Sequence, residues 1–259
     1  MEGEMRGDRA RGKVRDWARR RVSWIALGAI AVLLAAAAGV LAFRPSAPQT
    51  AFASDRVSGV PSNVPTALSN LMGLSPVRER GDAAPGFSLT DQLGRRMSLS
   101  SFRGHPVVLT FLDPRCVTMC PIIAQELADA ARHLKDVHPS VVFLAVNVNR
   151  HALGVATVRA FTDQQRLGKT PTWHFLTGHL SALERIWSEY GIYVKTRIVH
   201  GQWTVVHTTV DFFIGPTGKE RYAAAPNADY RATPTHRAYL PKSTYASWGR
   251  GIALVSRDL

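Results

Sequence analysis

The sequence predicts an α/β domain built on a mainly parallel sheet, and three observations support this prediction. Two continuous apolar runs, PVVLTFL at 106–112 and SVVFLAVNVN at 140–149, have the composition of strands buried on both faces. Each run is followed by a segment with apolar residues at helical spacing, at 120–134 and 155–167. Strands that alternate with helices form a parallel sheet with helices on its faces.

The remaining elements extend this plan at both ends. Residues 87–102 alternate on either side of DQLG and predict a β-hairpin, with Gly94 supplying the positive φ of the turn. A third strand at 172–178 precedes a third helix at 179–192, which Gly191 closes. Residues 204–224 predict two short strands around GPTG, an antiparallel hairpin at the end of the sheet, and residues 239–255 a final amphipathic helix. This order is that of a thioredoxin-like fold with an N-terminal β-hairpin and an insertion.

A membrane anchor is expected before this domain. Residues 24–43 form an uncharged apolar run of 20 residues, enough for a helix to cross a bilayer. Eight basic residues precede it and place a tail, residues 1–23, in the cytoplasm, so the domain lies outside the cell membrane. The alternative is a cleaved signal peptide, because AFA at 51–53 has the pattern of a cleavage site.

Charge and composition limit the rest of the chain. Residues 44–83, rich in Pro, Gly, Ser and Ala, are expected to be a linker with a short helix near 66–72, and the folded domain is expected to span 84–259. Of the net charge of +13, the first 23 residues carry +4 and the remainder +9. That surplus is diffuse, and we expect no nucleic-acid partner.

The two cysteines of the chain, Cys116 and Cys120, lie four apart at the start of the first helix. The helix N-terminus and Arg115 both favour thiolates, so we expect a lowered pKa for both cysteines. The spacing permits a reversible disulfide between them. It also separates the sulfurs more than the two-residue spacing of thioredoxin does, which suits a metal. Thiolates select Cu(I) or zinc, but two sulfurs need a further donor.

His207 is the candidate for that donor. It stands in VVHTTVDFFI at the start of a strand that, in a thioredoxin-like sheet, lies beside the first turn of the cysteine helix. The other histidines have no such relation and are expected to be surface or core residues: His105, His133, His138, His151, His174, His179, His200 and His236. We expect Met119 to pack rather than bind metal, and Asp113 to cap the turn.

The motifs GHPVVLTFLDPRCVTMCP, HFLTG and VVHTTVDFFIGPTGK resemble those of the Sco (SenC) copper chaperones, which help assemble the binuclear copper site of cytochrome c oxidase. The resemblance covers roughly residues 84–224 and includes the single N-terminal span. It implies a thioredoxin fold that binds copper, as Cu(I) or Cu(II), through Cys116, Cys120 and His207. Two positions depart from the family pattern: Val117 replaces a proline, and Asn147-Val148 replaces Asp-Pro.

Two functions remain open at this point. The first is a membrane-anchored copper chaperone, not an enzyme, whose partner is the copper-binding subunit of cytochrome c oxidase or another exported client. The second is a thiol-disulfide oxidoreductase that uses the redox pair Cys116 and Cys120 on client cysteines without metal. A peroxidase fits less well, because no single peroxidatic cysteine is evident. A permanent disulfide is also disfavoured, because a bridge at the start of a helix would staple so large a domain poorly.

Overall fold

The computed structural model describes residues 58–77, 82–199, 202–225 and 242–259. All of them belong to one compact unit, Ser54–Leu259. The tail, the expected membrane span at 24–43 and parts of the expected linker (44–57 and 78–81) lie outside the described residues, as do His200 and His236. Within the residues that are described, no helix is both long and apolar enough to cross a bilayer.

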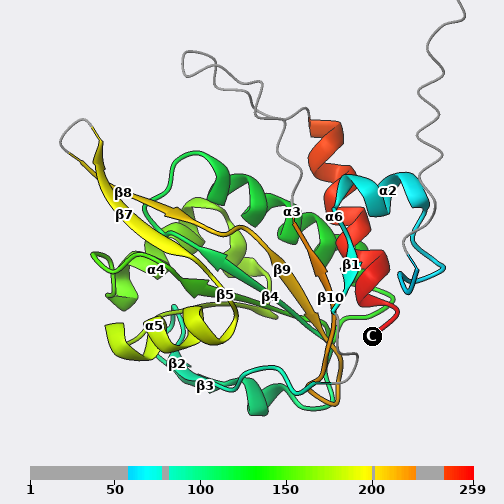
Figure 1. Cartoon of the computed structure of the whole chain (residues 1–259), viewed down its shortest axis with the longest axis horizontal. Helices are drawn as coiled ribbons and strands as arrows, with labels where there is room; N and C mark the ends of the chain where they lie inside the picture. The colour runs from blue at the N-terminus through cyan, green and yellow to red at the C-terminus, as the bar shows by residue number, and fades with distance from the viewer. Residues whose placement is uncertain (1–57, 78–81, 200–201, 226–241) are drawn as a thin grey trace, which may run out of the picture. The chain divides into compact units, whose positions relative to one another are not determined.

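The secondary structure follows the predicted order (Figure 1). The helical elements are α2 (Thr66–Leu71), η1 (Leu99–Phe102), α3 (Met119–Leu134), α4 (Val155–Gln164), η2 (Leu167–Lys169), α5 (Leu180–Glu189) and α6 (Lys242–Ser256). The strands are β1 (Ser75–Pro76), β2 (Ser88–Thr90), β3 (Arg96–Ser98), β4 (Val107–Leu112), β5 (Val142–Asn147), β6 (Trp173–Leu176), β7 (Val194–Val199), β8 (Gln202–His207), β9 (Asp211–Ile214) and β10 (Glu220–Ala224).

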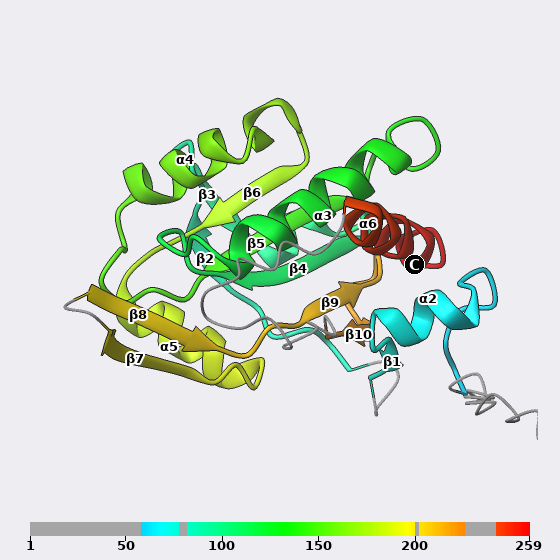
Figure 2. The same cartoon turned by 90° about the horizontal axis from the view of Figure 1, so that it is seen from above.

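Six strands form the central sheet, in the order β1-β10-β9-β4-β5-β6. β4, β5 and β6 are parallel, whereas β9 pairs with β4 in the antiparallel sense and leads through a tight turn into β10. Every residue of β4, β5 and β6 is buried, as their continuous apolar runs predicted. The predicted thioredoxin-like α/β arrangement and its terminal hairpin are therefore confirmed (Figure 2).

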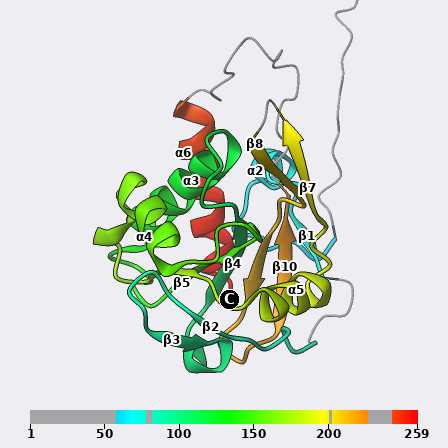
Figure 3. The same ribbon diagram turned by 90° about the vertical axis from the view of Figure 1, so that its left-hand side faces the viewer.

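Helices cover both faces of the sheet and create two hydrophobic clusters. One cluster joins α2, α3, α4 and α6 to one face, and Cys120 belongs to it. The other joins α5, the β2–β3 hairpin and η1 to the opposite face. α6 packs along α3, so the predicted C-terminal helix is confirmed and covers the helix that carries Cys120 (Figure 3). Gly249 of α6 permits this close approach, because a Cβ there would collide with α3.

Two expectations about the fold were incomplete. The folded unit does not begin near Ala84: Val60, Val64, Met72 and Leu74 belong to the first cluster, and β1 pairs with β10. The predicted linker thus supplies part of the core, although the short helix within it is confirmed as α2. The insertion also has a structure that the pattern did not predict, because β7 and β8 pair only with each other and form a separate hairpin.

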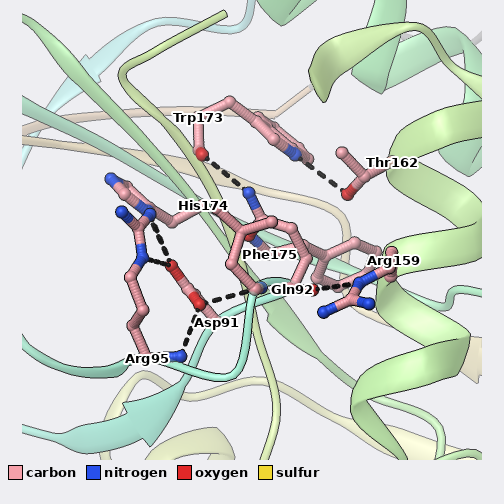
Figure 4. Close-up of polar contacts among 9 residues, drawn as sticks. Asp91, Gln92, Arg95, Arg159, Thr162, Trp173, His174 and Phe175 are labelled. Atoms are coloured by element: carbon pink, nitrogen blue, oxygen red, sulfur yellow. Dashed lines mark hydrogen bonds and ion pairs between the residues drawn. The ribbon is translucent and has the colours of Figure 1, made fainter. Parts of the chain in front are cut away.

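A buried polar network attaches the β2–β3 turn to β6 (Figure 4). Asp91 accepts hydrogen bonds from the backbone N–H groups of Leu93 and Arg95 and lies 3.4 Å from His174 Nδ1. Gln92 donates to Trp173 O and accepts from Phe175 N–H. Burial lowers the pKa of His174 despite the adjacent carboxylate. His174 is therefore a core histidine, as the sequence indicated, and the network fixes the hairpin against the sheet.

Candidate metal centre

The two cysteines meet at the first turn of α3. Cys120 lies in the helix and is buried, whereas Cys116 lies in the preceding loop and is partly buried. The Cys120 backbone N–H donates to Cys116 Sγ over 3.4 Å, so the sulfur caps a free N–H of the helix. Thr118 Oγ1 is 3.5 Å from the same sulfur. Both cysteines are free, and the predicted placement of Cys120 at a helix start is confirmed.

The two thiols differ in acidity. A hydrogen bond from the Cys120 thiol, helped by Thr118, lowers the pKa of Cys116 to about 5. The partner thiolate and burial raise the pKa of Cys120 well above its usual value. The expectation of a lowered pKa for both cysteines is therefore wrong for Cys120, because a buried thiol that stabilises a neighbouring thiolate must keep its own proton. The pair consists of an accessible thiolate and a buried thiol.

His207 is brought to this pair from a distant part of the chain. It is the last residue of β8, and its Nε2 lies 3.9 Å from Cys120 Sγ. Its Nδ1 is 2.9 Å from Thr208 O, and a carbonyl oxygen can only accept, so Nδ1 carries the proton. In the neutral imidazole, Nε2 is then the nitrogen without a proton, and its lone pair is available for a metal. His207 precedes β9 by four residues and closes the hairpin, rather than starting the central strand as predicted.

The separation of Cys120 and His207 fits a metal ion shared by these two side chains. With metal–sulfur and metal–nitrogen bonds of about 2.3 and 2.0 Å and an angle of about 120°, two donor atoms lie about 3.7 Å apart. The separation of Cys120 Sγ and His207 Nε2 is 3.9 Å. Among the described residues, however, no group of three or more His, Cys, Asp or Glu side chains is arranged to hold a metal as it stands. An ion held by all three side chains would therefore require them to move closer together.

A hydrogen-bonded loop network supports the cysteines. Asp113 accepts from the Arg115 backbone N–H and from the Asn149 side chain, both over 2.8 Å, which confirms its predicted capping role. The Asp113 backbone N–H donates to Cys120 Sγ over 3.4 Å. Asn149 lies just beyond β5 and had no recognisable signal in the sequence. The loop after β5 and the cysteine loop are thereby fixed to each other.

Asn147 stands where the Sco family pattern has an aspartate, and the structure gives a reason for the amide. This buried amide donates to Ala152 O and lies 3.1 Å from Thr177 Oγ1, while its oxygen accepts from Asn149 N–H. A carboxylate here would face the carbonyl of Ala152 without a proton to donate. The amide therefore suits this loop better than an aspartate would.

Two buried carboxyl groups, one on α3 and one on β9, were not predicted from the sequence. Glu126 of α3 and Asp211 of β9 are each 1% exposed, and burial raises their pKa values to about 9 and about 7. Glu126 Oε2 has no hydrogen-bond partner within the described part of the chain. Glu126 could have been found from the sequence, because it is an acidic residue on a helix face that is otherwise apolar.

A thioredoxin-like domain with a dithiol at a helix start and an imidazole nitrogen beside it defines a class of protein that binds soft metals or exchanges disulfides. The comparison with known proteins is more specific. The model of the SCO1/SenC family matches residues 76–234, and the chain belongs to this family. The SCO1 protein homologue of Bacillus subtilis (strain 168) is 23% identical over 146 residues, which cover 56% of this chain and 75% of the homologue.

Solved structures agree on the fold. ScoI of Arabidopsis thaliana, a structure with copper bound, is 19% identical with a TM-score of 0.55 and matches 69% of this chain and 100% of its own. BsSco, described as a member of the Sco family of cytochrome c oxidase assembly proteins with a disulfide switch, is 22% identical with a TM-score of 0.50 and matches 70% of this chain and 98% of its own. At these identities the likeness concerns the fold.

Proposed function

We propose that this chain is a membrane-anchored copper chaperone that binds copper through Cys116, Cys120 and His207 and delivers it during assembly of the cytochrome c oxidase copper site. The contact between Cys120 Sγ and Nε2 of His207, whose Nδ1 faces the Thr208 carbonyl, is the observation that carries the proposal. Membership of the SCO1/SenC family and the copper bound to Arabidopsis ScoI support the choice of copper. The anchor is residues 24–43, and the domain lies outside the membrane.

The donor set suits a cargo that must be both held and released. Two sulfurs and one imidazole favour Cu(I), and the partial exposure of Cys116 and His207 leaves one side of the site open to an acceptor. Metal binding displaces the Cys120 proton, since the ligand is the thiolate. The acceptor protein can then replace the donors one at a time.

Titration of the reduced full chain with Cu(I) tests this proposal. His207→Ala should bind copper much more weakly while still forming the Cys116–Cys120 disulfide, because the dithiol is untouched. Replacing either cysteine should abolish both properties. His105→Ala is the matched control, because this exposed histidine lies at the opposite end of β4 from the cysteine loop. Unchanged copper affinity and spectrum in His207→Ala would contradict the proposed site.

The unequal thiols favour thiol-disulfide exchange as a second candidate function. The Cys116 thiolate is partly exposed and can attack a client disulfide, forming a mixed disulfide and releasing one client thiolate. Cys120, on losing its proton, then attacks the Cys116 sulfur, which leaves an intramolecular disulfide and a fully reduced client. Normal reduction of a client disulfide by His207→Ala, together with wild-type copper binding, would favour this function over the chaperone.

A further inference from the structure

We propose that the ring stack between His151 and Trp203 is a clasp that positions β8 so that His207 reaches the dithiol. The proposal rests on the copper site described above and identifies what controls its third donor. The two rings have centroids 4.5 Å apart and planes inclined by 19°. They join the loop after β5 to the hairpin, two segments that have no strand pairing with each other.

Trp203 and His207 lie on the same face of β8. The β7–β8 register pairs Ile198 with Trp203 and Val194 with His207, and alternate residues of a strand point to the same side. Val205, between the two, packs against the second hydrophobic cluster. One face of β8 therefore contacts the domain at three alternate residues: Trp203 stacks on His151, Val205 packs on the core, and His207 faces Cys120.

The His151 side of the clasp is tied to the cysteine loop. The His151 backbone N–H donates to Asn149 Oδ1 over 2.8 Å, and Asn149 Nδ2 donates to Asp113 Oδ1 over 2.8 Å. Asp113 N–H in turn contacts Cys120 Sγ. A continuous series of contacts thus runs from Cys120 through this loop to Trp203, and back along β8 to His207.

The hairpin has little else to hold its outer part. The hairpin extends away from the central sheet (Figures 1 and 2). Ile198 and Val199 in its outer part are exposed. At its base, Tyr193 and Thr208 exchange hydrogen bonds through Thr208 N–H to Tyr193 O and Tyr193 N–H to Thr208 Oγ1. Next to His207, this base can act as a hinge. An open clasp would let β8 swing away and carry His207 from Cys120.

The clasp is a weak contact, so its loss should change the copper affinity only modestly. Aromatic stacking contributes enough beyond burial to change an equilibrium about two- to tenfold. Trp203 is 54% exposed, which keeps the effect within that range. Opening the clasp should leave the dithiol intact, and its consequence for copper should pass entirely through His207.

The test compares Cu(I) affinity in the reduced full chain, measured by competition with a colorimetric Cu(I) chelator. Trp203→Ala and His151→Ala should each bind Cu(I) about two- to tenfold more weakly, with no further loss in the double variant. Trp203→Phe should restore affinity because it restores the stack. Val199→Ala is the matched control, since Val199 pairs with Gln202, is exposed and lies on the opposite face of the hairpin from Trp203. The rate of Cys116–Cys120 disulfide formation should be unchanged throughout.

Repeating the measurement in a His207→Ala protein distinguishes an effect on the position of His207 from a general loss of protein stability. If the clasp acts through His207, then Trp203→Ala should change nothing further in a His207→Ala protein. An equal loss in both backgrounds would overturn the clasp, as would wild-type affinity in both single variants. If His207→Ala itself has no effect, the proposed copper site fails instead. If Trp203→Ala does not fold, His151→Ala tests the same contact from an exposed loop residue.

Discussion

The pH dependence of alkylation provides a direct test of the unequal thiols. The hydrogen bond from Cys120 lowers the pKa of Cys116 from 9.0 to about 5. At pH 7 the thiolate fraction of Cys116 should therefore be about 99%, against about 1% for a thiol with a pKa of 9. A thiolate of such low pKa is also a weaker nucleophile, by about 40- to 100-fold when the Brønsted coefficient is about 0.4–0.5.

These two effects nearly cancel at pH 7, so a single rate at that pH does not distinguish the two cases. The shape of the profile does. The rate for Cys116 should reach half its maximum near pH 5 and stay constant above about pH 6, whereas an ordinary thiol accelerates up to pH 9 and beyond. Cys120 should react slowly over this whole range, since it is buried and protonated.

The assay is iodoacetamide modification of the reduced protein, followed by mass spectrometry, with the two sites assigned by fragmentation of the peptide that contains both. Cys120→Ala should move the Cys116 profile to higher pH, because it removes the largest cause of the low pKa. Thr118→Ala should move it less. A Cys116 rate that rises through pH 8–9 in parallel with a small-molecule thiol would refute the reasoning.

Two further predictions concern stability. Glu126 holds its proton up to about pH 9 in the folded state, whereas the unfolded state loses it near pH 4.5, so unfolding free energy should fall as pH rises between these values. Urea denaturation at pH 7 and pH 9 measures this fall in unfolding free energy, which should be up to about 3 kcal/mol. Glu126→Gln should remove the fall. Asp136→Asn, at an exposed position, should leave it unchanged. Gly249→Ala should cost about 1–3 kcal/mol through collision with α3, whereas Gly86→Ala, where an added Cβ meets open space, should be near neutral in the same assay.

Patterns in the sequence predicted the helices and strands correctly wherever one or both faces of an element were uniformly apolar. β4 and β5 are buried at every position, and the turn at Gly94 has the expected positive φ of 82°. The β7–β8 hairpin was missed because its strands alternate around basic and polar residues and are largely exposed, so no apolar run marked them. The contribution of α2 to the core was missed because its partner α6 is distant in sequence.

At the site, residue types indicated which groups could meet but not how they would interact. The positions of Cys116, Cys120 and His207 were inferred from motifs, and the structure places Cys120 against each of the other two. The unequal acidity of the thiols depends on which sulfur is buried, and the burial of Cys120 follows from the packing of α3 in the first hydrophobic cluster rather than from the four-residue spacing. The His151–Trp203 stack joins residues 52 positions apart, so no local pattern in the sequence indicated it.

The shared cluster of α2, α3 and α6 determines where the chain can be cut. The match to the SCO1/SenC family ends at residue 234 and starts at residue 76, so it excludes Met72 and Trp248, both of which lie in the same core as Cys120. A fragment trimmed to the family match would leave the outer side of α3 open to water. The dithiol would then sit on a helix that has lost its cover, and apparent defects in metal binding would report truncation rather than chemistry. Expression of residues 54–259 keeps this core complete.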